Sequence, residues 1–538
     1  MATPPAVHHP RSLHSGFLNH EATHPDFIAL SVGGREYTYA EVGETARRWA
    51  GALREAEGGR PSRVAVLGYR SPTSYTAVLA ALLAGAAFVP LNPRFPLARN
   101  RAMLERAQVD ALIVDAADAA ALPGLLDGLT RHPAVLLPGT ETLSLPEHSA
   151  RPVLLRPDLE RFAPTDELPR TDPCDMAYLL FTSGSTGVPK GVPISHGNVR
   201  AFLDVNQDRY RLTASDRLTQ TFDQTFDLSV FDLFMAWDNG ARVCAIEPIE
   251  LLSPYDFLGR NRVTVWFSVP SAAAVLLKRG SLRPGRMPTL RWSLFCGEAL
   301  PQRIAEAWQA AAPGSIVENL YGPTELTIAC SAYRWDPATS PQECHNDLVP
   351  IGRPYPGMIP LIVDERLESV AAGESGELCL AGPQRFAGYW RAPELTAERC
   401  LERDGLTYYR TGDMVRAVRA TDGPDADLVF LGRNDQQVKV GGYRIELGEV
   451  EAALRSAGSV EAVCLVHPER EEIVAFVSGG RTQELLASVS GRLPAYMIPR
   501  SVHALEDMPR NSSGKIDRNA LRRSLISPSE GCRVVHAR

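Results

Sequence analysis

The chain has 538 residues, which is long for a single hydrophobic core and predicts two to four domains or subdomains. Hydrophobic residues make up 44% and charged residues 22%, and 56 basic against 63 acidic residues give a net charge of −7. This composition, without a basic surplus, argues against a nucleic-acid partner. The nine cysteines are dispersed without a Cys-x-x-Cys pair, so they predict neither a disulfide framework nor a structural zinc site.

The apolar pattern predicts a cytoplasmic protein without a membrane partner. The first residues, MATPPAVHHPRSLH, lack the apolar centre of a signal peptide. The longest apolar run, 77–91, is broken by Gly85 and Pro90. It has about fifteen residues, whereas a membrane span needs about twenty.

Short apolar strands alternate with helical patterns through the first part of the chain. Residues 63–68 (RVAVLG), 87–91 (AFVPL) and 111–115 (ALIVD) predict strands, and 74–86 predict a buried helix. The same alternation of strands and helices is indicated by further apolar runs at 241–246, 263–270 and 291–297. Alternation of this kind predicts an α/β fold with largely parallel sheets covered by helices, in which ligands bind in loops beyond the carboxyl ends of the strands.

The pattern changes further along the chain and predicts three parts. A large N-terminal domain covers 11–432 and includes a β-rich subdomain from about residue 350, where short strands and turns dominate. A small α+β C-terminal domain covers 433–525, with helices at 447–457 and 482–492, strands at 460–467 and 472–477, and a final loop. We expect the tail, 526–538, to be disordered.

A glycine- and hydroxyl-rich stretch, FTSGSTGVPKGVPISHGN at 181–198, follows a short apolar run. Successive backbone N–H groups in such a turn form a nest for anions, and Lys190 adds a positive charge. The spacing differs from the common P-loop, which ends in Gly-Lys-Ser/Thr. The stretch therefore predicts a phosphate loop of another kind, with a flexible surface loop as the alternative.

Further segments stand in a fixed order after this loop. They are FDQTFDLSVFDLF (222–234), ENLYGPTELTIACS (318–331), GELCLAGPQRFAGYW (376–390), YRTGD (409–413), LGRNDQQVKVGGYRIELGEVE (431–451) and NSSGKIDR (511–518). Together they resemble the adenylate-forming superfamily over nearly the whole chain. More narrowly, they are similar to the freestanding amino-acid adenylation domains of nonribosomal peptide synthesis.

The resemblance implies a two-step reaction that uses ATP and Mg²⁺ and no tightly bound organic cofactor. A carboxylate attacks the α-phosphate of ATP to give an acyl-adenylate, and a thiol then displaces AMP. That thiol belongs to the phosphopantetheine arm of a carrier protein, or to coenzyme A. No carrier attachment site follows residue 525 and no condensation motif precedes residue 30, so we expect a freestanding enzyme that loads a separate carrier protein.

The resemblance also assigns the nucleotide site. It implies that the phosphates bind Thr182, Ser183, Gly184, Ser185, Thr186, Gly187 and Lys190. The implied adenosine contacts are Gly297, Glu298, Ala299, Asn319, Tyr321, Asp413 and Arg433. Glu325 and Thr324 would bind Mg²⁺, a hard cation that takes oxygen ligands. Without the resemblance, Glu325 would be interpreted as a charge at a helix N-terminus and Asp413 as a turn residue.

Lys515 is the residue that the resemblance implies for the first chemical step. A cation between the substrate carboxylate and the α-phosphate offsets their repulsion. Because Lys515 lies in the small domain, its position depends on a rotation of that domain about a hinge at Asp435. After the rotation, the loop with Lys439, Gly441 and Gly442 would face the active site and admit the thiol.

Asp227 distinguishes an amino acid from other carboxylic acids. A buried carboxylate needs a charged partner, so Asp227 predicts a substrate ammonium group, with a helix N-cap as the alternative. Phe226 matches the aromatic gate of the thiol tunnel. The implied pocket wall is apolar: Leu228, Phe231, Phe267, Leu294, Cys296, Leu320, Ile328 and Ala329. It favours a small to medium apolar side chain, proline first and alanine next.

Two other functions stay open at this point. An acyl- or aryl-CoA ligase would share the phosphate loop, although Asp227 argues against it. A catalytically silent relative would bind nucleotide as a scaffold, although Lys190, Glu325, Asp413 and Lys515 are all present. The residues do not distinguish an α-amino from a β-amino acid.

Overall fold

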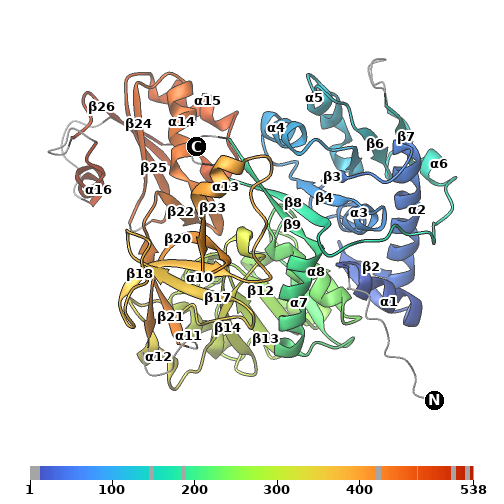
Figure 1. Ribbon diagram of the computed structural model, residues 1–538, viewed down its shortest axis with the longest axis horizontal. Coiled ribbons are helices and arrows are strands. Elements are labelled where there is room, and N and C mark those ends of the chain that lie inside the picture. Colours follow the sequence, from blue (N-terminus) through green and yellow to red (C-terminus); the bar gives the residue numbers. More distant parts are fainter. Residues whose placement is uncertain are drawn as a thin grey trace. The chain divides into compact units, whose positions relative to one another are not determined.

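The computed structural model describes residues 12–143, 151–184, 188–418, 426–468, 470–510, 516–526 and 533–536. The chain divides into two compact units (Figure 1). The first consists of Met1–Asn92, Leu104–Leu180 and Gly191–Gly432, and the second of Pro93–Met103, Phe181–Lys190 and Arg433–Arg538.

Two mostly parallel sheets form the centre of the first unit. The seven-stranded sheet has the order β7-β6-β5-β3-β4-β8-β9, with β3 (Arg63–Leu67), β4 (Ala87–Leu91), β5 (Ala111–Val114), β6 (Ala134–Leu137), β7 (Val153–Leu155), β8 (Met176–Thr182) and β9 (Lys190–Ser195). The nine-stranded sheet has the order β16-β15-β14-β13-β12-β10-β11-β1-β2, with β1 (Ile28–Val32), β2 (Arg35–Thr38), β10 (Arg217–Gln220), β11 (Arg242–Ala245), β12 (Val265–Ser268), β13 (Trp292–Phe295), β14 (Ile316–Tyr321), β15 (Ser331–Arg334) and β16 (Arg353–Pro354). The strands expected at 63–68, 87–91, 111–115, 241–246, 263–270 and 291–297 are therefore confirmed.

Helices pack against these sheets, including α3 on β3 and β4 and α8 on β10 and β11. The helices outside the C-terminal segment are α1 (Ser15–Thr23), α2 (Tyr39–Glu57), α3 (Pro72–Leu83), α4 (Leu97–Ala107), α5 (Leu122–Leu126), α6 (Arg156–Leu159), α7 (His196–Tyr210), α8 (Leu228–Trp237), α9 (Tyr255–Asn261), α10 (Pro270–Lys278), α11 (Gln302–Ala311), α12 (Ser340–Glu343) and α13 (Pro393–Arg399). None of the described helices has the length and apolar character that a membrane span requires. None of the cysteines among the described residues forms a disulfide.

Local sequence signals explain where several helices begin. Thr38 and Glu41 form a capping box at the start of α2, with the Thr38 hydroxyl accepting from the N–H of Glu41 at 3.1 Å. Ser71 caps α3 in the same way, and Pro72 follows at its first position, where a missing N–H costs nothing. Helix α3 is buried on almost every side, as its apolar sequence predicts.

The β-rich subdomain expected from about residue 350 is a five-stranded sheet, in which β17, β18, β20 and β19 pair antiparallel. Its order is β17-β18-β20-β19, with β21 paired to β20, and its strands are β17 (Ile359–Val363), β18 (Ser375–Ala381), β19 (Cys400–Arg403), β20 (Leu406–Val418) and β21 (Asp427–Arg433). Strand β20 contains Asp413, and the loop after β18 contains Gln384 and Tyr389.

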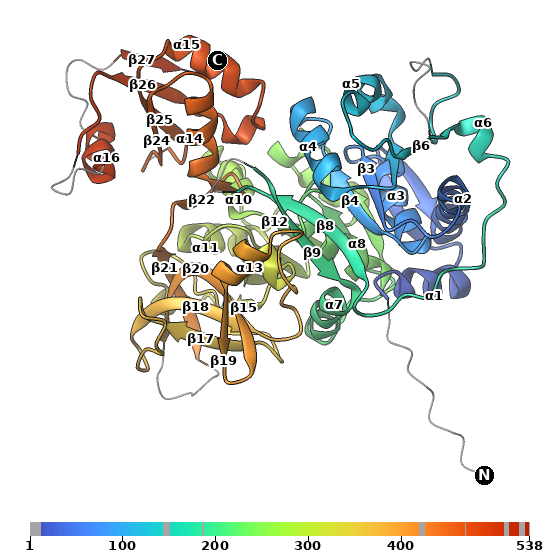
Figure 2. The same cartoon turned by 45° about the horizontal axis from the view of Figure 1, so that its top comes forward.

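The second unit contains two small sheets (Figure 2). Its elements are β22 (Gln437–Val440), β23 (Tyr443–Glu446), α14 (Leu447–Ser456), β24 (Glu461–Val466), β25 (Ile473–Ser478), α15 (Thr482–Ser490), β26 (Ser501–Leu505), α16 (Arg518–Ile526) and β27 (Arg533–His536). Strands β24, β25, β26 and β27 form one sheet in that order, and α14 and α15 pack on it around a shared apolar core. The expected helices at 447–457 and 482–492 and the strands at 460–467 and 472–477 are confirmed.

The end of the chain differs from our expectation. We expected a final loop and a disordered tail over 526–538, but β26 pairs in parallel with β25, and β27 pairs antiparallel with β26. The prediction was wrong for β27 because four residues, Arg-Val-Val-His, are too few to show an alternating pattern. Pairing with an existing strand edge, rather than local sequence, makes this segment a strand.

Two buried histidines fix the first described residues to helix α7. The N–H of Leu13 donates to Nδ1 of His196 at 3.0 Å, and the rings of His14 and His196 meet edge to face at 6.0 Å. Burial lowers the pKa of His14 to about 3, helped by the neighbouring His196, and burial lowers the pKa of His196 to about 4. Both rings are therefore neutral near pH 7, so that Nδ1 of His196 can accept its hydrogen bond.

We expect acid to destabilise the fold through these two histidines. In the folded protein, the pKa values of both histidines lie below the usual 6.5. At a pH between the folded and the unfolded pKa, the unfolded chain therefore binds more protons than the folded chain. Their contribution to stability is complete above pH 6.5, and each should lose about 1.4 kcal/mol per pH unit as the pH falls towards 4. Urea unfolding at pH 7, 6 and 5 measures this slope. His14→Gln should make the slope shallower, and an unchanged slope would contradict the assignment.

Candidate active site

The candidate residues of the first unit follow the carboxyl ends of neighbouring parallel strands. Strands β10, β12, β13 and β14 are consecutive in the nine-stranded sheet and run parallel. The segments after β10, β13 and β14 contain Asp227, Gly297 and Glu325, respectively. Parallel strands end at the same edge of a sheet, so these segments meet there.

One face of this sheet carries four candidate pocket residues. Phe267 of β12 lies beside Leu294 of β13, which in turn lies beside Glu318 of β14. Because side chains alternate along a strand, Phe267, Leu294, Cys296 and Leu320 point to the same face. All four are at most 1% exposed.

Helix α8 and the segment after β14 complete this apolar group. The ring of Phe231 lies 5.0 Å from that of Phe267 and 5.7 Å from that of Tyr210. Leu228, Ile328 and Ala329 belong to the same buried hydrophobic cluster. Strand register and ring contacts bring Phe231, Phe267 and Leu294 together, and the other apolar candidates lie in the same large core of the first unit.

Asp227 lies directly before α8 and is 7% exposed. Its backbone is already helical (φ −64°, ψ −22°), and its carboxylate makes no capping bond to the described helix. A capping residue has an extended backbone and accepts such a bond, so the helix-cap alternative is not supported. Burial raises the pKa of the nearby Tyr178 hydroxyl, and the Asp227 charge raises it further. Phe226, the expected thiol gate, is half-buried against the same hydrophobic cluster.

Glu318 is a second carboxylate on the face that carries Leu294 and Leu320, and it is fully buried. Arg209 binds both of its oxygens at 2.7 and 3.0 Å, and Arg334 binds one of them at 2.9 Å. A buried carboxylate held by two arginines is neutralised within the fold. It is therefore not available to a basic substrate side chain.

Two of the expected adenosine contacts touch each other in the structure. The Tyr321 hydroxyl donates to the Asp413 carboxylate at 2.6 Å, and both groups are buried. Asn319 donates through Nδ2 to the carbonyls of Val349 and Pro350, at 3.3 and 2.8 Å. Asn319, Tyr321 and Asp413, which the sequence separates by up to 94 positions, thus lie in one part of the first unit.

The segment after β13 has a backbone that its sequence explains. Gly297 has a φ of +92°, a conformation in which a side chain would be strained. The Glu298 carboxylate accepts a hydrogen bond from the N–H of Ser271 at 2.9 Å, which ties this segment to the start of α10. Ala299, the third expected contact here, is half-buried.

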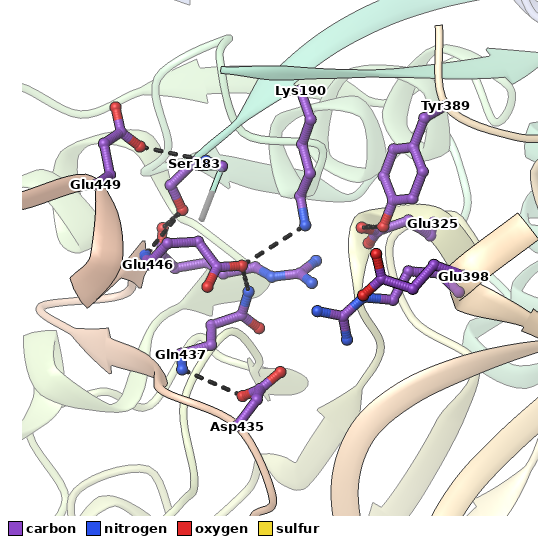
Figure 3. Close-up of polar contacts among 12 residues, drawn as sticks. Ser183, Lys190, Glu325, Tyr389, Glu398, Asp435, Gln437, Glu446 and Glu449 are labelled. Carbon is purple, nitrogen blue, oxygen red and sulfur yellow. Dashed lines mark hydrogen bonds and ion pairs between the residues drawn. The ribbon is translucent and has the colours of Figure 1, made fainter. Parts of the chain in front are cut away.

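Glu325, the expected metal ligand, lies in the short 3-10 turn Thr324–Leu326 and is fully buried. Tyr389 donates its hydroxyl to Glu325 Oε1 at 2.6 Å (Figure 3). The Tyr389 hydroxyl also lies 3.2 Å from that of Tyr409. We did not predict this role for Tyr389, because only the fold brings a residue 64 positions away to Glu325.

The donor set fits magnesium. Among the described residues, no group of three or more His, Cys, Asp or Glu side chains could hold a metal ion. Mg²⁺ needs no such group, since it binds one or two carboxylates and completes its shell with waters and substrate phosphates. Glu325 and Thr324 remain the residues that would hold a magnesium ion.

The described part of the phosphate loop contacts the segment 444–449 within the second unit (Figure 3). The Ser183 hydroxyl donates to the carbonyl of Arg444 at 2.9 Å and accepts from the N–H of Glu446 at 3.1 Å. The N–H of Gly184 donates to the Glu449 carboxylate at 3.2 Å. One backbone N–H of this loop thus binds an anionic group, and its role in holding phosphates stays a prediction.

Lys190 ends this loop and is almost completely buried. Its ammonium lies 3.7 Å from the Glu446 carboxylate, which also accepts from the Gln437 amide at 2.6 Å. The sequence did not predict Glu446 or Glu449 as partners of the loop. Four further expected residues, Ser185, Thr186, Gly187 and Lys515, lie outside the described residues.

The expected hinge residue, Asp435, is bound by its neighbours in the sequence. Arg433 donates to both of its carboxylate oxygens, at 2.7 and 2.8 Å, and the N–H of Gln437 donates at 3.1 Å. Arg433, which we expected to contact adenosine, is thus held by Asp435 in this structure.

The turn between β22 and β23 consists of Gly441 and Gly442. Their φ angles are +58° and +84°. A two-residue hairpin turn of this kind needs positive φ at both positions, which only glycine adopts readily. Lys439, on the strand before the turn, is exposed.

Comparison with known proteins places the chain in a family. Residues 17–390 match the model of the AMP-binding enzymes, and residues 449–515 match the AMP-binding enzyme C-terminal domain. The chain is 33% identical over 524 residues to one of the linear gramicidin synthase subunits of Brevibacillus parabrevis, covering 94% of this chain and 10% of that protein. It is 34% identical over 538 residues to phosphinothricin tripeptide synthetase PhsC of Streptomyces viridochromogenes, covering 95% of this chain and 45% of that protein. The chain thus spans less than half the length of these relatives.

Solved structures of similar length match as well. The crystal structure of IdnL7 is 40% identical with a TM-score of 0.73, covering 97% of this chain and 100% of that chain. The adenylation domain AlmE of Vibrio cholerae, solved with glycyl-adenosine-5′-phosphate, is 29% identical with a TM-score of 0.86, covering 98% and 100%. These matches confirm the predicted α/β fold with its β-rich subdomain and small C-terminal domain. The chain belongs to the AMP-binding enzyme family and is an AMP-forming adenylation enzyme of the nonribosomal-peptide-synthesis type.

Proposed function

We propose that this enzyme activates a small to medium apolar amino acid as its aminoacyl-AMP and transfers it to the phosphopantetheine thiol of a separate carrier protein. Proline is the preferred candidate and alanine the next. The observation that carries the proposal is the buried carboxylate of Asp227 beside a wholly apolar cluster. Glu318, a buried carboxylate of β14, is held by two arginines.

The chemistry of the pocket supports an amino acid over a plain carboxylic acid. A buried carboxylate is stabilised by a cationic partner, and the α-ammonium of an amino acid would supply one. The apolar cluster would bury the substrate side chain without leaving a polar group unsatisfied. The AlmE structure, which contains an aminoacyl-adenylate, supports the same class of substrate.

In the first step, the amino-acid carboxylate would attack the α-phosphate of ATP. The phosphate loop and Lys190 would hold the β- and γ-phosphates, and Glu325 and Thr324 would hold the Mg²⁺ that neutralises phosphate charge. Asp413, oriented by the Tyr321 hydroxyl, would accept hydrogen bonds from the ribose. Lys515 would lie between the two reacting anions and stabilise the charge that develops in the transition state.

In the second step, the carrier thiol would attack the acyl group and AMP would leave. Asp435 would act as the hinge for the change between the two steps. Lys439, Gly441 and Gly442 would then face the reaction, and Phe226 would control entry of the thiol. Phosphopantetheine would arrive on the carrier protein rather than bind as a resident cofactor.

Amino-acid-dependent exchange between ATP and pyrophosphate tests the proposal. The assay should include the proteinogenic amino acids, several β-amino acids, and a few fatty and aryl acids. We expect exchange with one small apolar amino acid and none with the plain acids. Exchange with a plain carboxylic acid only would contradict the assignment of Asp227 and favour an acyl or aryl ligase.

A further inference from the structure

The wall of the proposed pocket contains a strained turn. Thr327 and Ile328 both have positive φ, +59° and +71°. The N–H of Ala329 donates to the carbonyl of Thr327 at 2.9 Å, which makes Ile328 the centre of a three-residue γ-turn. Both residues are β-branched, and γ-turns with positive φ are rare and strained. Such a conformation persists only where surrounding contacts enforce it.

The chain returns closely on itself at this turn. The N–H of Cys330 donates to the carbonyl of Tyr321 at 2.7 Å. A Cβ at Gly322 would lie 2.6 Å from Cα of Ala329, so only glycine fits there. The turn therefore determines where Ile328 and Ala329 lie relative to the end of β14.

Gln384 provides contacts that enforce the turn. Its side-chain Nε2 lies 2.7 Å from the carbonyl of Ala329, 3.3 Å from that of Leu326 and 3.4 Å from that of Thr327. Its own backbone carbonyl accepts from the Thr327 hydroxyl at 2.5 Å. Gln384 is 1% exposed, so water does not replace these bonds. One residue thus binds the strained segment on both sides of its turn.

The other end of the Gln384 amide supports this interpretation. Its Oε1 is buried and has no hydrogen-bond partner among the described residues. A buried acceptor without a hydrogen bond costs free energy, which the bonds from Nε2 of Gln384 to the turn offset. The amide is therefore placed for its bonds to the turn rather than for its own solvation.

The same segment of chain also holds Glu325. The N–H of Phe386 donates to the carbonyl of Glu325 at 2.9 Å, and the Tyr389 hydroxyl binds its carboxylate (Figure 3). Residues 384–389 therefore contact both the expected metal ligand and the wall of the amino-acid pocket.

We propose that Gln384 is a positioning residue for amino-acid selection, which rests on the proposed function of the pocket that Ile328 and Ala329 line. By holding the γ-turn, Gln384 sets the position of this wall and so the size of side chain that fits. Loss of its bonds would let the turn relax, widen the range of accepted side chains and weaken binding of the preferred one.

Gln384→Met tests the proposal, because methionine keeps the approximate length and removes the donors. We expect the KM for the preferred amino acid to rise roughly three- to tenfold, as for one or two lost hydrogen bonds. The KM for ATP should stay unchanged. The preference over an analogue with one more methylene should fall.

Gln309→Met is the matched control. Gln309 also donates its amide to two carbonyls, those of Ala312 and Ser315, but at the other end of β14. The Gln309→Met substitution should change the thermal stability of the enzyme without changing the KM for the amino acid or for ATP. Equal effects of the two substitutions on the amino-acid KM would overturn the proposal.

Thr327→Val provides a milder second variant should Gln384→Met fold poorly. It removes only the hydroxyl that binds the Gln384 carbonyl and keeps the shape of the side chain. The amino-acid KM should rise in the same direction and the effect should be non-additive with Gln384→Met. Unchanged amino-acid kinetics in both variants would overturn the proposed role of Gln384 but not the proposed function of the enzyme. A parent enzyme that exchanges with no amino acid would overturn the proposed function, and this inference with it.

Discussion

Asp227→Asn should raise the KM for the amino acid by roughly 100-fold or more and leave the KM for ATP unchanged. The substitution keeps the shape of the side chain but removes the charge that the substrate ammonium would meet. Loss of one partner of a buried ion pair costs about 3–5 kcal/mol. Exchange kinetics with each substrate varied in turn give the two KM values.

Asp232→Asn is the matched control on the same helix. Asp232 is fully buried, and this burial raises the pKa of its carboxyl well above the usual value. The amide keeps the shape of this side chain, which is not one of the residues proposed to meet the substrate ammonium group. Asp232→Asn should leave the amino-acid KM unchanged. Similar effects at both positions would mean that Asp227 stabilises α8 rather than the substrate.

Glu325→Gln should lower the rate of adenylation by roughly 100-fold or more, since electrostatic groups at a reacting phosphate have effects of this size. The amide keeps an acceptor for the Tyr389 hydroxyl but removes the negative charge that Mg²⁺ would bind. Added Mg²⁺ should restore part of the rate. Thioester formation from supplied aminoacyl-AMP should be unaffected, because the β- and γ-phosphates have already left.

Tyr389→Phe separates the charge of Glu325 from its hydrogen bond. This variant keeps the carboxylate and removes the hydroxyl that lies 2.6 Å from it. We expect a much smaller loss of adenylation than with Glu325→Gln. An equal loss in both variants, or a loss of thioester formation with Glu325→Gln, would contradict a role for the carboxylate in binding metal.

The sequence was sufficient for the parts of the fold that carry a strong local pattern. The strands β3, β4 and β5 are apolar runs of four or five residues between helices, and the helix α3 is apolar throughout. Such segments are specified by burial and chain length. Strand β27 has no such pattern, because it is four residues long and depends on the edge of β26. Short edge strands are defined by their partner, which the sequence does not reveal.

The residues of the candidate site also fall into those that the sequence predicts and those that it does not. The apolar pocket residues were predicted from motifs, and all of them lie in the main hydrophobic core of the first unit. Gln384, Tyr389 and Glu318 were not predicted, because each acts on a residue distant in the sequence. Their contacts with Ala329, Glu325 and Arg209 depend on how β18, β14 and α7 are placed by the fold. A hydrogen bond between distant segments has no spacing that a sequence can show.

The pairing of Glu318 with two arginines limits how this pocket could evolve. Glu318 lies beside Leu294, which is one of the proposed pocket residues. Replacing Arg209 by an apolar residue would leave this carboxylate with Arg334 as its remaining arginine partner. The same mutation would leave a buried carboxylate with less compensation and reduce stability. A change at Arg209 that alters the charge near the proposed pocket therefore needs a stabilising background to survive selection.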